Sequence, residues 1–348
     1  MLTARAPGKL LVFGEYAVLD GAPALVQAID RQAQVRLRWH DAGMHQVRAL
    51  PIAPEPSRFR FDPNGRVHWQ SSEGAPALAY VEALLNALGP LPGGADRCLD
   101  IELDTRDFFD TGAANKLGLG SSAALTVALV SAWTALAEGQ GGSRPGLDRL
   151  VELHRGLQGG RGSGVDVAAS VAGGLVVYRG GDVASASRIM PPPGLDWMWI
   201  WLGKSASTSE FLAGMAHYRS QRADHYRQRI ETMTALAEAG VRALSRGDSN
   251  GLLAIIDGYG QAMAQLGDSA GLPIWTDDHR RLALWAERLD VAFKPSGAGG
   301  GDIALAAGSD VEALAALARQ AQSSGYRVLP LAPAETGLQL QWHNASES

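Results

Sequence analysis

A glycine- and serine-rich segment runs directly into a long apolar one, and this junction constrains the fold more than any other sequence feature. Residues 118–123 read Gly-Leu-Gly-Ser-Ser-Ala, and the mostly apolar run that starts at the serines stops before Gly139. This pattern predicts a helix over 121–138. Glycines allow a close approach of the backbone, and the free N–H groups of a first helical turn favour a phosphate. The sequence therefore predicts an anion site at this junction.

Other interpretations of the junction exist. It also reads G-x-G-x-x-A, the dinucleotide-binding pattern, with Glu138 twenty residues after Gly118. That pattern requires a preceding strand, whereas the polar TGAANK precedes this loop, and Glu138 ends a helix instead of a strand. A Walker A loop does not occur in the sequence. Simple helix capping by Ser121 remains an alternative, and Ser122 is a candidate ligand for Mg²⁺.

Composition limits the classes of function. A chain of 348 residues suits two domains. Its net charge of -5 argues against nucleic acid or an anionic membrane as a partner. The single cysteine, Cys98, excludes an intrachain disulfide and fits a reducing compartment. Because Pro7, Gly8 and Lys9 interrupt the first residues, we expect no signal peptide and a cytoplasmic monomer or homodimer.

The periodicity of the rest of the chain predicts a mixture of strands and helices. Strands at 9–13 and 23–29 flank an Asp20-Gly21 turn. The prolines at 191–193 suggest a connection between two domains, which we place at 1–187 and 188–348. Further strands are predicted at 33–39, 58–61, 66–70, 98–103, 174–178, 197–201, 302–306, 326–331 and 337–342, and helices at 76–88, 146–158, 208–246, 249–267, 276–289 and 309–323.

Two more segments of small residues are candidates for binding. Asp166 is the one acid within GSGVDVAASVAGG, so it could orient or deprotonate a substrate, or cap a helix that begins near Val167. The segment KPSGAGGGD over 294–302 surrounds Ser296 with glycines, whose N–H groups could form an anion nest. Taken alone, this segment is better explained as a flexible surface loop, but three such segments in one chain favour anion binding.

Three of these segments together resemble the motifs of the GHMP kinases. The sequences PGKLLVFGEYAVLDG, KLGLGSSAAL and KPSGAGGGD occur in the order typical of that family. Within the family, GSGVDVAA after a His-Arg helix end and GKSASTSE after a tryptophan-rich strand are similar to the bacterial phosphomevalonate kinases. The resemblance implies an α+β fold, with an N-terminal domain like ribosomal protein S5 domain 2 and a C-terminal ferredoxin-like domain. It also implies ATP, Mg²⁺ and phosphomevalonate as ligands in the cleft between the domains.

The resemblance also implies roles for individual residues. Lys9 and Asp166 would face the reacting groups. The residues expected to bind ATP are Lys116, Gly118, Leu119, Gly120, Ser121, Ser122 and Ala123, with Ser122 as the metal ligand. The residues expected to hold the acceptor are Tyr16, Ser163, Gly164, Ser207, Thr208, Ser296, Gly297 and Ala298.

One departure from the family bears on the acceptor. Mevalonate kinases carry a metal-binding glutamate about eleven residues before the catalytic aspartate, and Arg155 stands there in this chain. This counts against mevalonate as the acceptor and leaves the metal to Ser122, ATP oxygens and water. The alternatives are another GHMP kinase, acting on mevalonate, homoserine or a sugar, and a non-catalytic binding protein of the same fold.

Overall fold

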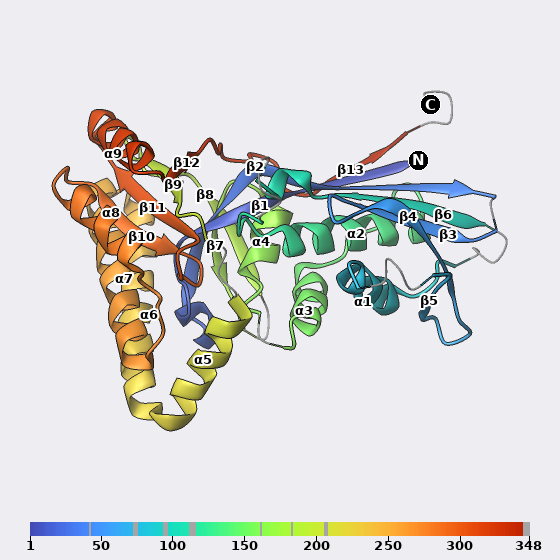
Figure 1. Ribbon diagram of the computed structural model, residues 1–348, viewed down its shortest axis with the longest axis horizontal. Coiled ribbons are helices and arrows are strands. Elements are labelled where there is room, and N and C mark those ends of the chain that lie inside the picture. Colours follow the sequence, from blue (N-terminus) through green and yellow to red (C-terminus); the bar gives the residue numbers. More distant parts are fainter. Residues whose placement is uncertain are drawn as a thin grey trace.

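Two β-sheets organise the protein. The computed structural model describes residues 1–41, 43–71, 76–92, 97–110, 116–160, 162–181, 184–204 and 208–343. Over these residues it contains one nine-stranded and one four-stranded sheet, each with its own helices (Figure 1). The α+β prediction is confirmed.

The large sheet is built around a long hairpin. Its main path runs β13-β1-β2-β6-β3-β4-β5, with β7 paired to β2 and β8 to β7. All described pairs are antiparallel except β3 with β6. The strands are β1 (Leu2–Phe13), β2 (Pro23–His40), β3 (His45–Leu50), β4 (Ala53–Phe61), β5 (Val67–Trp69), β6 (Cys98–Asp104), β7 (Leu175–Arg179), β8 (Ser185–Ile189) and β13 (Gln339–Trp342).

Helices α1 (Ala79–Leu88), α2 (Ser121–Glu138), α3 (Leu147–Leu157) and α4 (Val165–Ala172) lie on one side of this sheet (Figure 1). Helix α2 packs on β1 and β2 and has the bounds predicted from sequence. By length and composition α2 could cross a membrane, but 72% of it is buried inside the protein, as in a core helix.

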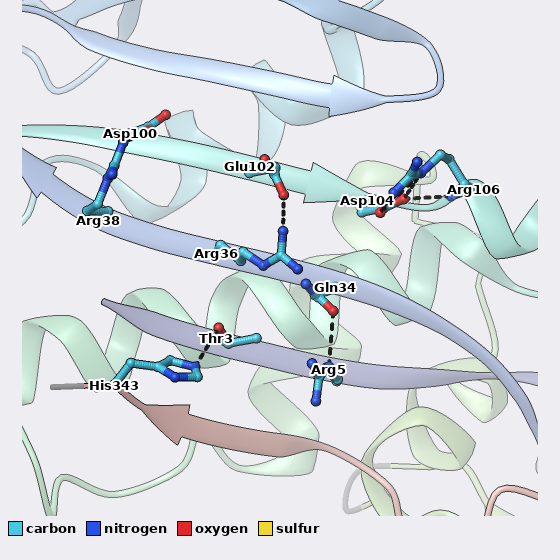
Figure 2. A network of polar contacts seen from close by, with 10 residues as sticks. All are labelled: Thr3, Arg5, Gln34, Arg36, Arg38, Asp100, Glu102, Asp104, Arg106 and His343. Carbon is cyan, nitrogen blue, oxygen red and sulfur yellow. Dashed lines mark hydrogen bonds and ion pairs between the residues drawn. The ribbon is translucent and has the colours of Figure 1, made fainter. Parts of the chain in front are cut away.

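The opposite face of the sheet carries paired charges. Arg36 pairs with Glu102, and Arg38 pairs with Asp100 at 2.8 Å, across β2 and β6 (Figure 2). These polar residues alternate along β2 with buried ones such as Val35. Exposed ion pairs add little stability, so the ladder mainly keeps this face hydrated.

The small sheet has the order β10-β11-β9-β12. Trp199 and Trp201 on β9 are buried and pack in the core. Figure 1 shows α6 and α7 as a long helical pair beside this sheet. The elements are β9 (Asp196–Trp201), β10 (Ala292–Ser296), β11 (Ile303–Gly308), β12 (Arg327–Leu329), α5 (Thr208–Gln221), α6 (Ala223–Arg246), α7 (Ser249–Ala270), α8 (Asp277–Glu287) and α9 (Val311–Ser323).

Several predicted elements differ from the structure. The strands expected at 23–29 and 33–39 are one strand, because the register shifts between Pro7 and Gly8 of β1, which leaves residues 30–31 of β2 as a bulge before pairing resumes at Gln32. The helix expected over 208–246 breaks at Arg222. The Asp20-Gly21 turn is the end of a 3-10 helix, η1 (Ala17–Asp20), and 292–296 forms a strand.

The domain division at 187/188 stays a prediction. This position lies inside β8, and the last strand, β13, returns to pair with β1. The last described strand therefore forms the edge of the large sheet beside the first one (Figure 1). We propose a first domain that includes β13.

A buried ion pair joins the two sheets. Lys294 Nζ on β10 lies 2.6 Å from Glu15 Oε1 after β1, and their side chains are only 0% and 3% exposed. The Gly297 N–H donates to the same carboxylate oxygen at 3.2 Å, and the Tyr259 hydroxyl donates to the Glu15 carbonyl at 2.8 Å. The segment 7–21 and the third glycine segment, residues 294–302, are thereby held together.

Lys294→Met should destabilise the protein strongly. Removing one partner of a buried pair leaves the Glu15 carboxylate uncompensated, which costs about 3–5 kcal/mol in free energy of unfolding. The double variant Glu15→Gln/Lys294→Met should recover much of this loss. Denaturant unfolding measures the free energy of unfolding of both variants. Arg38→Met, which breaks an exposed ion pair, is the control. A loss for Lys294→Met no larger than for Arg38→Met would contradict the assigned role.

Candidate active site

Two adjoining cavities lie where the two sheets meet. The larger has a volume of about 760 Å³ and the smaller about 120 Å³. Lys9, Asp166, Thr208, Gly297 and Ala298 line both of them. These residues therefore mark the boundary at which molecules in the two cavities would meet.

Most residues predicted from sequence line these cavities. Leu119 and Ala123 are instead fully buried and do not line them. Ser207 lies outside the described residues. The larger cavity contains Lys9, Lys116, Gly118, Gly120, Ser121, Ser122, Asp166, Thr208, Ser296, Gly297 and Ala298, and the smaller adds Tyr16, Ser163 and Gly164.

Strand β1 lies tightly against the glycine loop and so positions Lys9. The Lys9 N–H donates to the Leu119 carbonyl at 2.9 Å. A Cβ on Gly8 would lie 2.6 Å from that carbonyl oxygen, so only glycine permits this approach. The Lys9 side chain passes over Gly120, whose φ of +83° also favours glycine.

Lys9 and Asp166 form the ion pair at the centre of the site. Lys9 Nζ lies 3.3 Å from Asp166 Oδ1, with side chains 10% and 28% exposed. Asp166 is the second residue of α4, and Gly164 holds the capping position. The alternative that Asp166 caps the helix is therefore wrong. Asp166 thus lies in the first turn of α4, where an acidic side chain suits the helix dipole.

The start of α2 presents an anion site to the larger cavity. Gly120 takes the capping position in a left-handed conformation, so Ser121 is the first helical residue and not the cap. The N–H groups of a first turn lack partners within the helix. The Ser122 hydroxyl lies on this turn, 3.5 Å from His154 Nε2. These groups suit phosphate oxygens and a metal ion bound to them.

His154 is a site residue to which the sequence assigned no role. Its side chain is buried, and Gln158 Nε2 lies 3.2 Å from its Nε2. Burial lowers the pKa of His154, although the nearby Asp166 charge opposes this shift. Burial thus favours the neutral imidazole, whose Nε2 can accept a hydrogen bond from the Ser122 hydroxyl or from the Gln158 amide. A lone histidine on a helix gives no sequence signal for this contact.

Arg155 shapes the loop beside the smaller cavity. Its Nε donates to the Gly162 carbonyl at 2.7 Å, and its terminal nitrogen to the Ser163 carbonyl at 3.2 Å. The Tyr178 hydroxyl donates to the same Ser163 carbonyl at 2.7 Å. The position expected to hold a metal-binding glutamate in mevalonate kinases thus holds a cation that fixes backbone.

The third glycine segment is less open than the predicted anion nest. Two of its N–H groups donate within the protein, from Gly297 to Glu15 and from Gly300 to the Ile274 carbonyl at 3.1 Å. The nest prediction is therefore corrected at these two positions. The Ser296 hydroxyl likewise donates to a backbone carbonyl, that of Leu11, at 2.9 Å. The segment forms a rigid wall of both cavities.

Tyr16 supports the same wall. Its hydroxyl donates to the Ala298 carbonyl at 2.6 Å, and burial raises the pKa of this hydroxyl, which keeps the donor protonated. Tyr16 also has a positive φ of 61°, unusual for a residue with a side chain. The hydrogen bond to Ala298, in the segment 294–302, therefore helps to hold the Tyr16 side chain in the smaller cavity.

Comparison with known proteins finds similar sequences along most of the chain. The family described as GHMP kinases N terminal domain matches residues 75–174. A phosphomevalonate kinase of Streptomyces sp. (strain CL190) is 34% identical over 96% of this chain and 97% of its own length. A mevalonate kinase of Pyrococcus abyssi is 28% identical over 71% of this chain and 67% of its own length.

A solved structure has the same fold. The Streptococcus pneumoniae phosphomevalonate kinase in complex with phosphomevalonate and AMPPNP superposes with a TM-score of 0.75, covering 96% of this chain and 100% of its own, at 20% identity. The predicted GHMP kinase fold is confirmed. With a relative of 34% identity along nearly its whole length, the chain belongs to the GHMP kinase family.

Proposed function

We propose that this chain transfers the terminal phosphate of ATP to the phosphate group of 5-phosphomevalonate, giving 5-diphosphomevalonate and ADP, a step of the mevalonate route to isoprenoids. The observation that carries the proposal is the pair of cavities that meet at Lys9 and Asp166. The 34% sequence identity to the Streptomyces phosphomevalonate kinase, which extends over 96% of this chain, supports phosphomevalonate as the acceptor. We infer that the enzyme acts in the cytoplasm as a monomer or homodimer.

The two cavities suit the two substrates. The larger one contains the start of α2, so its N–H groups would bind the ATP phosphates. The smaller one is bounded by the backbone that Arg155 holds, and it would take the acceptor. In this arrangement the acceptor phosphate and the terminal phosphate of ATP approach each other beside Lys9.

The cavity residues fit a magnesium ion that arrives with the nucleotide. No group of three His, Cys, Asp or Glu residues that could hold a metal occurs among the described residues. The donor set instead offers the Ser122 hydroxyl beside a phosphate site, and Mg²⁺ is commonly held by few protein ligands plus phosphates and water. When bound, the ion would neutralise charge on the phosphates of ATP.

Charge, more than basicity, is the chemical problem of this reaction. A phosphate acceptor has its second pKa near 6, so at pH 7 its oxygen is already a nucleophile. That oxygen attacks the terminal phosphorus of ATP, the bond to the bridging oxygen breaks, and ADP leaves. Lys9 reduces repulsion between the two anions, and Asp166 orients Lys9 through their ion pair.

The acceptor is tested by comparing substrates. A coupled assay of ADP release should give a much higher kcat/KM with phosphomevalonate than with mevalonate or homoserine. The physical reason is that the site holds Arg155 where a mevalonate kinase would hold an acid. A preference for mevalonate would overturn the assignment.

Ser122→Ala should impair the use of magnesium. We expect the Mg²⁺ concentration for half-maximal rate to rise at least about tenfold, a loss seen even for residues that only support a metal ligand. Ser131→Ala is the matched control, because Ser131 is a buried serine of the same helix whose hydroxyl has no partner among the described residues. An equal Mg²⁺ dependence in the two variants would contradict the role of Ser122.

Substitutions in the Lys9–Asp166 pair should separate charge neutralisation from base catalysis. Lys9→Ala should raise the barrier by about 3–4 kcal/mol, as for loss of one preorganised stabilising donor. Lys9→Arg should rescue poorly, because a planar guanidinium does not fit a slot shaped to a point charge. Asp166→Asn keeps its shape and should retain clearly more activity than Asp166→Ala.

The pH profile is the deciding measurement for Asp166. Activity should rise with pH through about 6, as the acceptor phosphate loses its second proton. This acid limb should persist in Asp166→Asn. If the limb disappears, and the Asn variant is as inactive as the Ala variant, Asp166 is a base and the acceptor is an alcohol.

A further inference from the structure

Asp302 is a carboxylate in the larger cavity that the proposed mechanism does not use. It closes the third glycine segment and lines the cavity together with Lys9, Gly118 and Ser122. Its backbone carbonyl accepts the Leu202 N–H at 2.9 Å, which fixes the position of the residue. The function of this acid is therefore an open question within the site.

The carboxylate of Asp302 lies directly on the glycine loop. A Cβ added to Gly118 would lie 2.0 Å from Asp302 Oδ2 and 2.9 Å from Oδ1, so Gly118 makes room for this group. Asp302 Oδ1 is buried and has no hydrogen-bond partner within the part of the chain that the structure describes. Burial raises the pKa of Asp302 to about 6, while the charge of Lys9 opposes this rise.

A partly buried carboxylate beside the glycine loop favours a cation as its neighbour. An unpaired buried charge is costly, and a second anion beside it adds repulsion. Lys9 is the nearby cation whose charge acts on Asp302, but its ammonium group pairs with Asp166 at 3.3 Å. A divalent ion that enters with the nucleotide phosphates would supply the missing charge and bind carboxylate oxygen readily.

We propose that Asp302 coordinates the divalent cation that accompanies the nucleotide, a role that rests on the proposed use of Mg-ATP. The ion then lies between the Asp302 carboxylate and the phosphates above the glycine loop. Asp302 would then be the acidic metal ligand of this chain. The α3 position at which mevalonate kinases hold a metal-binding glutamate is Arg155 here. Metal and nucleotide binding are thereby coupled through Asp302.

Binding of ADP with and without Mg²⁺ tests the proposal by calorimetry, without turnover or acceptor. In the unmodified protein Mg²⁺ should tighten ADP binding by about tenfold, within the usual range for two coupled ligands. In Asp302→Asn this gain should fall below about threefold. Metal-free ADP should bind the variant at least as tightly as the unmodified protein, because a negative charge beside the phosphates is gone.

The control is Asp224→Asn, which removes an exposed carboxylate on α6 with a side chain 88% exposed and should leave both affinities unchanged. If Asp302→Asn keeps the full Mg²⁺ gain, or weakens ADP equally with and without Mg²⁺, Asp302 only supports the loop and the proposal is overturned. An unmodified protein that binds ADP with no Mg²⁺ gain would overturn it too. The choice of acceptor is judged separately, by the ADP-release assay.

Discussion

The buried contact between Glu15 and Lys294 is the constraint on which the rest of the site depends. It joins the turn after β1 to β10, so two segments almost the whole chain apart become one wall. A buried ion pair is weak as a source of stability, because desolvation offsets the attraction. We infer that it specifies how the two sheets align, since an alignment that separates the two groups would leave buried charges unpaired. Gly297 shares the same carboxylate and is positioned by it.

Close backbone packing explains why glycines surround the cavities. Gly8 lets β1 approach the Leu119 carbonyl, and Gly118 makes room for Asp302. Gly299 lies against the Ile274 carbonyl, where a Cβ would be 2.3 Å from the oxygen. In each case other protein atoms occupy the space that a Cβ would take. These glycines therefore let the cavity walls pack closely, as well as leaving space for a ligand. A glycine-rich motif can therefore indicate close packing of the backbone as well as a ligand site.

The electrostatics of the site are prepared for anions. Lys9 is partly neutralised by Asp166, His154 is kept neutral by burial, and Tyr16 remains a protonated donor. A phosphate entering the larger cavity meets N–H groups and the lysines Lys9 and Lys116, and in our proposal Asp302 holds a further cation. This distribution suits a reaction in which two anions must approach, because preorganised charges need no rearrangement during the reaction.

Local features were readable from the sequence, and contacts between distant segments were not. The bounds of α2 and the chemistry of Lys9, Asp166 and Ser122 follow from local pattern and motif, because a helix and a glycine loop depend on neighbouring residues. The continuity of β2, and the return of β13 to the first sheet, depend on strand partners far along the chain. The same holds for the contacts of Asp302 with Gly118 and of His154 with Ser122. The sequence by itself indicated which residues are candidates for the site, whereas only tertiary packing decided which groups surround them, because burial and pairing at long sequence separation carry no local pattern.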